Sequence, residues 1–463
     1  MSKLKNKILV WLRRDLRLKN NPALHQATHD CNEVFLTFIF DHKILAPLKN
    51  KNAQDRRIQF ICESLAHLQE KLSLYNTKII IKYGDPVEEI PQLAQHLSVQ
   101  AVYLNRDYSP YPLDRDKQVK QKLESMRVKF KSFQDHVMIE PDQLLNKQNN
   151  PYKVFTPYAN AWREKVSQLK SHNNKLLTTK FTHHYNEPQS VKELLKIAGF
   201  DQIKNELIGG ENKARENYKT FEQHMNDYED LRNFPYQNKT SKLSVYIRHG
   251  CISVQEIIHK IIHKKNSGIQ CWLNELIWRE FYQMITYHYP YVKNHAFKEK
   301  YQNLNYPGSK ELLIKWKEGR TGFPIIDAAM RCLNQTGWMH NRLRMLTASF
   351  LCKIALVDWK HGERYFAWKL LDYEFASNNG GWQWASSTGC DSAPYFRIFN
   401  PETQSKTYDK EGLFIKSFCP ELTHCSTKDI HAPPNHQRKN YPSPMVSYKE
   451  NRLKAIELYK KAS

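Results

Sequence analysis

The chain has 463 residues, of which 40% are apolar, and contains 70 lysines and arginines against 47 aspartates and glutamates. This length predicts two or three domains, and the net charge of +23 favours a polyanionic partner such as nucleic acid or an acidic membrane surface. The stretch MSKLKNKILV lacks the long apolar run of a signal peptide, no uncharged apolar run suggests a membrane span, and the nine cysteines form no CxxC pair. We therefore expect a soluble cytoplasmic protein with reduced thiols and no metal site.

The first 130 residues alternate between short β-branched or aromatic runs and longer amphipathic stretches, such as residues 54–74. The runs are ILVWL at 8–12, VFLTFIF at 34–40, KIIIK at 78–82 and AVYL at 101–104. This alternation predicts an α/β domain with a Rossmann-like parallel sheet over residues 1–130. RRDLRL follows the first run instead of GxGxxG, which argues against a nicotinamide cofactor.

Residues 131–204 are polar apart from one aromatic cluster, YKVFTPYANAW at 152–162, and are predicted to be a long connection between domains. From residue 205 to 463 the strand pattern stops and helical periodicity takes over, which predicts an all-α second domain. The amphipathic segments are SVQEIIHKIIHK, WLNELIWREFYQMI, FPIIDAAMRCL, MHNRLRMLTASFLCKIAL, GERYFAWKLLD and the final YKENRLKAIELYKK.

The segment WLNELIWREFY, residues 272–282, has an unusual helical face. At 3.6 residues per turn this face contains Trp272, Glu275, Trp278, Arg279 and Tyr282. One interpretation is a packing helix with tryptophans in a core and its charges in water. The other is a site for a flat, polar, π-rich ligand such as a nucleobase, which would stack on an indole and hydrogen-bond the carboxylate.

MHNRLRM, residues 339–345, gives a second such face, because Asn341, Arg344 and Met345 are three and four residues apart. Arg342 points elsewhere. If the Arg344 guanidinium is buried it needs a carboxylate partner, which LLDYEFASNN at 370–379 could supply; otherwise it is a surface arginine.

TSKLS, residues 240–244, places hydroxyl groups just ahead of an expected helix. Thr240, Ser241 and Ser244 are either N-caps or ligands of a phosphate at the helix N-terminus. NNGGWQW at 378–384 has a different character, because it contains no acid, base, thiol or hydroxyl that could attack a substrate.

Taken together, these motifs resemble the photolyase and cryptochrome flavoproteins, and most closely the class I cyclobutane pyrimidine dimer photolyases. The resemblance extends from VWLRRDLRL through YKVFTPYANAW to TGFPIIDAAMRCLNQTGWMHNRLRM, NNGGWQWASSTG and APYFRIFNP. It implies an α/β domain followed by a helical domain that buries FAD. It also implies a monomer without an obligate protein partner, in which light-excited reduced FAD gives an electron to a dimer flipped out of DNA. Such a reaction needs no nucleophile.

The resemblance assigns an electron path. Asn378 would face the flavin N5 and accept a hydrogen bond from it. Trp382 would be the electron donor nearest the flavin, with Trp359 behind it. Tyr306 stands where close relatives have a third tryptophan that ends the chain. Tyr306 also suits a packing role, in which case another aromatic residue such as Trp316 would be the terminal donor.

The other functional positions are carried over by the same resemblance. The positions matching flavin contacts are Tyr228, Thr240, Ser241, Lys242, Leu243, Ser244, Trp272, Asn341, Arg344, Asp372, Tyr373, Glu374 and Asn378. Glu374 stands where close relatives have Asp. The positions matching the dimer pocket are Glu275, Trp278, Asn341, Met345 and Trp384, and those near the DNA backbone are Arg232, Arg279, Arg342, Arg397 and Gln404.

The sequence does not decide whether the protein binds a second, light-harvesting chromophore. Lys293 matches a contact to a folate antenna, whereas Ser109, in NRDYSPY, stands where folate-binding relatives have an acid. A methenyltetrahydrofolate antenna, a deazaflavin antenna and no antenna are all compatible with the sequence.

Two other functions are weighed against dimer repair. Asn378, and the absence of a disordered tail after the final predicted helix, argue against a cryptochrome photoreceptor, in which Asp or Cys tends to replace the Asn. Repair of the (6-4) lesion needs histidine proton donors in the pocket. Asn341 and Met345 occupy those places, and neither can act as a general acid.

Overall fold

The computed structural model describes residues 6–169, 176–182 and 189–462. The chain divides into two compact units. The first contains Met1–Leu144, Ala161–Gln223 and Ser241–Lys265, and the second contains Leu145–Asn160, His224–Thr240 and Asn266–Ser463. This division differs from a simple cut after a linker, because part of the predicted helical region packs with the sheet. Buried Arg17 donates to the carbonyl of Gly250 (3.1 Å), and the backbone N–H of Leu18 donates to Glu211 (3.2 Å).

The first unit is built on a parallel sheet of five strands in the order β3-β2-β1-β4-β5. The strands are β1 (Lys7–Leu12), β2 (Glu33–Asp41), β3 (Ile79–Gly84), β4 (Ala101–Asn105) and β5 (Lys129–Phe133). The α/β prediction and its four strands are confirmed. The fifth strand was not predicted, because β5 lies at the sheet edge and its KFKSF sequence is only partly buried, which weakens the apolar signal.

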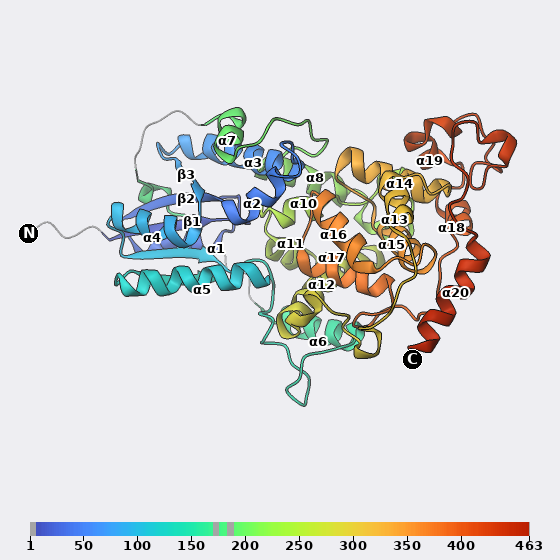
Figure 1. Ribbon diagram of the computed structural model, residues 1–463. Coiled ribbons are helices and arrows are strands. Elements are labelled where there is room, and N and C mark those ends of the chain that lie inside the picture. The colour runs from blue at the N-terminus through green and yellow to red at the C-terminus, as the bar shows by residue number, and fades with distance from the viewer. Residues whose placement is uncertain (1–5, 170–175, 183–188, 463) are drawn as a thin grey trace, which may run out of the picture. The chain divides into compact units, whose positions relative to one another are not determined.

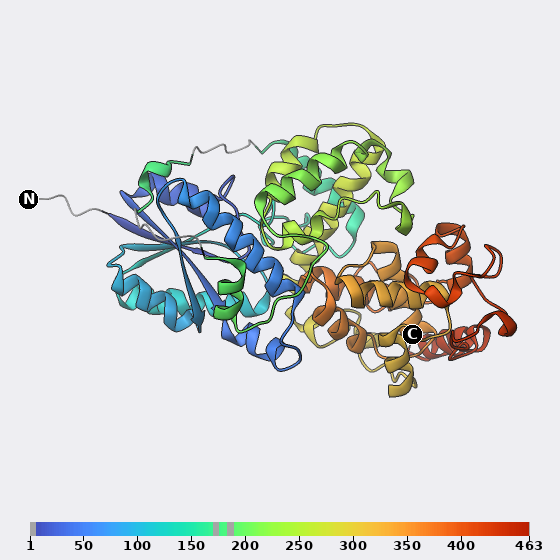
Figure 2. The same cartoon turned by 90° about the horizontal axis from the view of Figure 1, so that it is seen from above.

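Helices cover both faces of this sheet (Figures 1 and 2). Figure 2 shows the cyan helices α4 and α5 on one side of the strands and the blue helix α3 on the other. On the α4 and α5 side, Leu9, Trp11 and Phe35 of the sheet form one apolar core with Ile90 and Leu123 of the helices. The helices of this unit are α1 (Pro22–Asp30), α2 (His42–Lys49), α3 (Arg56–Ser73), α4 (Pro86–His96), α5 (Pro110–Ser125), α7 (Val191–Ala198), α8 (Glu211–Glu222), α10 (Leu243–Arg248) and α11 (Val254–Ile261).

The second unit is helical in its described residues, and α6 (Phe155–Ser167) lies across the division between the units. Its other helices are α9 (Tyr228–Leu231), α12 (Ser267–His288), α13 (Lys310–Glu318), α14 (Pro324–Thr336), α15 (Asn341–Lys353), α16 (Trp359–Lys369), α17 (Phe375–Ala385), α18 (Pro401–Tyr408), α19 (Leu413–Phe418) and α20 (Tyr448–Lys461). The predicted helical segments are confirmed. No helix in the described part of the chain is both long and apolar enough to cross a membrane.

Helix α17 was not predicted, because its two adjacent glycines disfavour a helix by about 1 kcal/mol each. The structure shows why glycine is present. α17 packs against α12, α15 and α16. A Cβ added to Gly380 would lie 2.2 Å from the Tyr282 ring of α12, and a Cβ added to Gly362 of α16 would lie 2.1 Å from the Trp382 ring. Close packing therefore requires glycine at 380 and at 362, and it brings α17 to the wall of a cavity.

Candidate functional site

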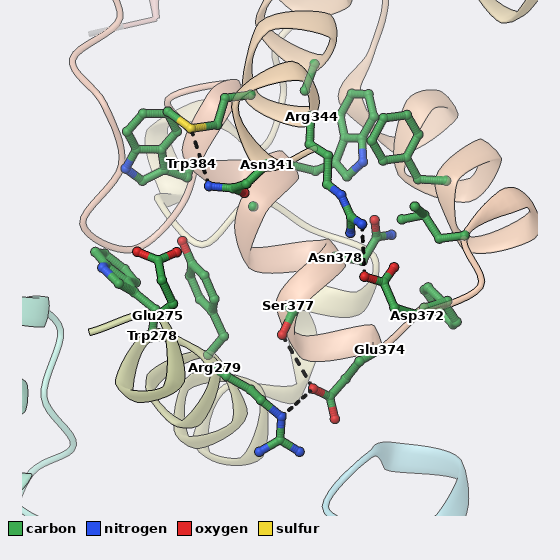
Figure 3. Close-up of a pocket in the computed structure, with 18 of the residues that line it drawn as sticks. Glu275, Trp278, Arg279, Asn341, Arg344, Asp372, Glu374, Ser377, Asn378 and Trp384 are labelled. Carbon is green, nitrogen blue, oxygen red and sulfur yellow. Dashed lines mark hydrogen bonds and ion pairs between the residues drawn. The ribbon is translucent and has the colours of Figure 1, made fainter. Parts of the chain in front are cut away.

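The second unit contains a cavity of about 370 Å³, bordered by α12, α15, α17 and the segment between α16 and α17 (Figure 3). A volume of this size is within the usual range for ligand sites. The residues that line it are Arg232, Glu275, Trp278, Arg279, Tyr282, Asn341, Arg344, Met345, Ala348, Phe366, Leu370, Asp372, Tyr373, Glu374, Ser377, Asn378, Gly381, Trp382 and Trp384. About half of the predicted site residues of the helical domain therefore meet in one place.

The predicted face of α12 forms one wall of the cavity. Glu275, Trp278 and Arg279 line it, whereas Trp272 is buried and is not part of the lining. A Glu275 oxygen lies 2.8 Å from Arg232 Nη1, and the same nitrogen donates to the sulfur of Cys271 (3.0 Å). Burial raises the pKa of Glu275 although Arg232 opposes the shift. Arg232, predicted to lie near the DNA backbone, thus contacts the carboxylate predicted to bind the bases.

The predicted face of α15 forms a second wall, and all three of its predicted residues line the cavity. Arg344 Nη2 donates to Asp372 Oδ2 (2.9 Å), and Arg344 Nε donates to the carbonyl of Met339 (2.7 Å). Asp372 is the carboxylate partner that the sequence left open. Its other oxygen, Oδ1, is buried without a hydrogen-bond partner in the described structure, so it is available to a ligand in the cavity.

Glu374 is bonded to α12. Gln283 Nε2 donates to Glu374 Oε1 (2.9 Å), and Arg279 Nε lies 3.4 Å from Oε2. Glu374 therefore joins two elements of the cavity wall. Arg279 is held at this wall by the same contact.

Asn378 of α17 is oriented by a residue that the sequence did not reveal. Its Nδ2 donates to both the backbone carbonyl and the carboxylate of Glu363, at 3.0 Å each. The side-chain oxygen Oδ1 takes part in neither bond, so it can accept a hydrogen bond from a ligand. At Gly381, which also lines the cavity, an added Cβ would meet no described atom within 4 Å.

Figure 3 shows two groups of side chains in this cavity. Arg344, Asp372 and Asn378 gather on one side, and Trp278, Trp384, Glu275 and Asn341 gather on the other. The first group offers a guanidinium, a carboxylate oxygen and an amide carbonyl. These groups fit the polar edge of the flavin that the sequence resemblance implies.

The predicted electron donors Trp382 and Trp359 are buried in the same helical core. The Trp382 ring centre lies 5.0 Å from Phe366 and 5.9 Å from Trp316. Trp316 is completely buried, and its indole nitrogen donates to the carbonyl of Thr347 (3.1 Å).

Tyr306, the predicted end of the path, is partly buried and packs against this core. Its hydroxyl lies 3.1 Å from the hydroxyl of Tyr459 on α20, which donates to the carbonyl of Ser386 (2.6 Å). Burial raises the pKa of Tyr306 well above its usual value.

The predicted DNA-backbone residues Arg342, Gln404 and Arg397 do not line the cavity. Arg342 Nη2 donates to Asn233 Oδ1 (2.7 Å), Nη1 donates to Gln404 Oε1 (3.3 Å), and the guanidinium lies 3.8 Å from the centre of the Tyr408 ring. Arg397 is exposed, and its carbonyl accepts a hydrogen bond from Lys353 (3.2 Å).

The remaining predicted flavin contacts also lie outside the cavity lining. Tyr228 is buried, with its ring centre 5.4 Å from the Arg232 guanidinium. Thr240 Oγ1 is buried without a partner in the described structure. Ser241 Oγ accepts from the backbone N–H of Leu243 (3.3 Å), but the N-cap of α10 is Lys242, and no side chain caps this helix. Lys242, Leu243 and Ser244 follow in the first unit.

The two predicted antenna positions are in different units. Lys293 is exposed, and Ser109 precedes α5 without a capping bond from its hydroxyl. Among the described residues, no cluster of His, Cys, Asp and Glu could hold a metal ion.

Comparison with known proteins gives two matches to family models. The model of the FAD binding domain of DNA photolyase matches residues 272–461, and the DNA photolyase model matches residues 8–177. The deoxyribodipyrimidine photo-lyase of Vibrio cholerae is 36% identical and covers 98% of this chain and 99% of its own length.

Solved structures are similar over the whole length. A bacterial class III photolyase from Agrobacterium tumefaciens has a TM-score of 0.88 and 29% identity, and the match covers 100% of this chain and 98% of that one. An archaeal photolyase from Sulfolobus tokodaii, described with two FAD molecules, has a TM-score of 0.85 and 32% identity, covering 98% of this chain and 100% of that one.

Proposed function

The chain belongs to the DNA photolyase family, and on that premise we propose that it is a deoxyribodipyrimidine photo-lyase that splits cyclobutane pyrimidine dimers in DNA with light. The observation that best supports this function is the cavity with two unlike sides (Figure 3). One side offers charged and amide groups for a cofactor, and the other offers two indoles and a carboxylate for a substrate base.

The cofactor is FAD. Once reduced and excited by light, bound FAD supplies the electron that splits the dimer. Arg344 and Asp372 form an ion pair that would hold the polar edge of the isoalloxazine ring, and Asn378 Oδ1 would accept a hydrogen bond from its N5. Glu363 keeps the Asn378 amide nitrogen turned away, so the carbonyl is the group presented.

The dimer would enter on the side of Trp278 and Trp384. Indoles can stack on flipped bases, and Glu275 can hydrogen-bond their polar edge. Asn341 and Met345 complete this side, and the Asn341 amide nitrogen lies 3.9 Å from the Met345 sulfur. Neither side chain can donate a proton as a general acid, which favours cyclobutane dimers over (6-4) lesions as substrate.

Three further assignments belong to this proposal. Tyr228, Thr240 and Ser241–Ser244 would bind the adenine, phosphate and ribitol parts of FAD. The exposed Arg397 and the half-buried Arg342 would contact phosphates of DNA, consistent with the net charge of +23. The protein would work in the cytoplasm as a monomer.

Illumination of defined DNA tests the function. The reduced protein under blue light should split thymine cyclobutane dimers in an oligonucleotide and leave (6-4) products untouched. Equal turnover in the dark, or repair of (6-4) products alone, would contradict the proposal. Flavin binding with no repair of either lesion would favour the cryptochrome alternative. The absorption spectrum of the purified protein decides between a folate antenna, a deazaflavin antenna and no antenna.

A further inference from the structure

The indole of Trp278 is stacked on a ring from a distant part of the chain. Phe155, the first residue of α6, lies parallel to Trp278, with ring centres 3.8 Å apart and planes 4° apart. An indole has two faces, and a parallel ring at this distance covers one of them. Trp278 lines the cavity whereas Phe155 does not, so the face that Phe155 leaves free is the one available to a base.

Phe155 is fixed by contacts that do not involve Trp278. Its backbone N–H donates to Asp391 Oδ2 (3.0 Å), and the Cys390 thiol donates to the carbonyl of Lys153 (2.8 Å). The Phe155 ring also meets Phe281 edge to face, with ring centres 5.9 Å apart. The segment before α6 is thus attached to the loop that follows α17.

The other neighbours of Trp278 do not fix its plane in the same way. Phe281 meets the indole at 84° and Tyr282 meets it at 37°, with ring centres 5.5 and 5.3 Å away. These rings contact the indole edge to face or at a tilt. Phe155 is the ring in this group that lies parallel to the indole and can therefore set its tilt.

We propose that Phe155 is a positioning residue for the lesion: it backs Trp278 and holds the indole in the plane on which the flipped dimer stacks. This inference rests on the proposed function and adds to it a residue that touches neither dimer nor flavin. If the indole is already held in position, its side chain loses less conformational freedom when a base stacks on it. This smaller loss favours affinity for the lesion. DNA without a lesion has no base in the pocket and gains nothing from the stack.

The test is dark binding of a labelled oligonucleotide with one thymine dimer, compared with the same oligonucleotide without it. Phe155→Leu keeps an apolar side chain but removes the flat ring. It should weaken binding of the dimer about 2- to 10-fold, the range of one aromatic pair, and leave binding of undamaged DNA unchanged. Phe155→Tyr keeps the ring and should bind like the wild-type protein. Asp391→Ala removes the acceptor of the Phe155 N–H and should weaken dimer binding in the same sense.

A double-mutant cycle shows whether Phe155 acts through Trp278. In the Trp278→Ala background, Phe155→Leu should cause no further loss. Full additional loss there, equal loss on undamaged DNA, or wild-type dimer binding by Phe155→Leu would overturn the inference. Thermal unfolding and flavin absorbance check that each variant is folded. If the wild-type protein itself does not prefer dimer-containing DNA, the proposed function fails and this inference with it; an unchanged preference in Phe155→Leu refutes the inference alone.

Discussion

Arg342 is the arginine for which the structure gives the sharpest prediction about DNA. Its contacts are the amide oxygens of Asn233 and Gln404 and the ring of Tyr408, all of them neutral. Neutral partners orient the guanidinium without cancelling its charge. If this oriented charge binds a phosphate, Arg342→Ala should weaken binding to all DNA sequences alike and reduce the dependence of affinity on salt.

The size of the effect follows from counterion release. One phosphate contact contributes about 0.9 to the slope of log affinity against log salt on duplex DNA. Raising the salt from about 50 to about 200 mM is a fourfold change, so this contact alone makes wild-type affinity fall by an extra factor of about 3.5. The variant should lack that factor. Arg397 is exposed, and Arg397→Ala should lack the same factor.

A matched control separates a phosphate contact from the general loss of charge. Arg320 is also an arginine of the helical unit, but its Nε donates to Glu318 (2.8 Å), which compensates its charge. Arg320→Ala should keep the wild-type salt slope. Anisotropy titrations with flavin-loaded protein at four salt concentrations measure all three variants. Parallel lines for wild type, Arg342→Ala and Arg397→Ala would refute the assignment of these arginines to phosphates.

Three further predictions concern the cofactor, the electron path and stability. Asp372→Asn removes the charge that Arg344 faces, and since hydrogen bonds to charged groups are worth about 1.5–3 kcal/mol, flavin affinity measured by titration should fall about tenfold or more; unchanged affinity would exclude the pair from the flavin site. Tyr306→Phe should slow photoreduction of the oxidised protein with an external reductant but leave repair by chemically reduced protein intact; an undiminished rate would mean that electrons arrive by another route. Burial lowers the pKa of His340, the N-cap of α15, to about 4. Between about pH 6.5 and 4 only the unfolded chain binds this proton. The contribution of His340 to the free energy of unfolding is therefore fully present above about pH 6.5, and about 3 kcal/mol is lost as the pH falls to about 4. His340→Asn keeps a capping acceptor, and urea unfolding at pH 7 and 4.5 should show a weaker pH dependence; an equal dependence would place the titration elsewhere.

Much of the fold could be predicted because its signals are local. Four strands of the sheet have continuous β-branched or aromatic runs, and the long helices have a clear 3.6-residue period. The two elements that the sequence did not reveal have the opposite character. β5 is half-exposed at an edge. α17 contains a pair of glycines, and the close neighbour of Gly380, the ring of Tyr282, lies on another helix.

The same distinction applies to the site. Residues on one helical face, such as Asn341, Arg344 and Met345, could be grouped because helical spacing puts them together. Contacts between residues on different helices could not be predicted in this way. Glu363 is bonded to Asn378 between α16 and α17, and nothing in the spacing of these residues distinguishes Glu363 from a surface carboxylate. Pairing of this kind depends on how the helices pack, which periodicity does not encode.

The residue that ends the electron path also depends on contacts between distant parts of the chain. Trp316 lies beside Trp382, but it is fully buried and its N–H is bonded to an amide carbonyl, so an oxidised Trp316 would have no base to take its proton. Tyr306 is partly exposed, yet its hydroxyl meets the hydroxyl of Tyr459, whose own proton is directed at Ser386. A phenol and an amide carbonyl are both very weak bases. If Tyr306 ends the path, we expect the slow step of photoreduction to be release of the Tyr306 proton to water rather than arrival of the positive charge. Heavy water should accordingly slow photoreduction in the wild-type protein and have little effect on it in Tyr306→Phe, which has no such proton to release.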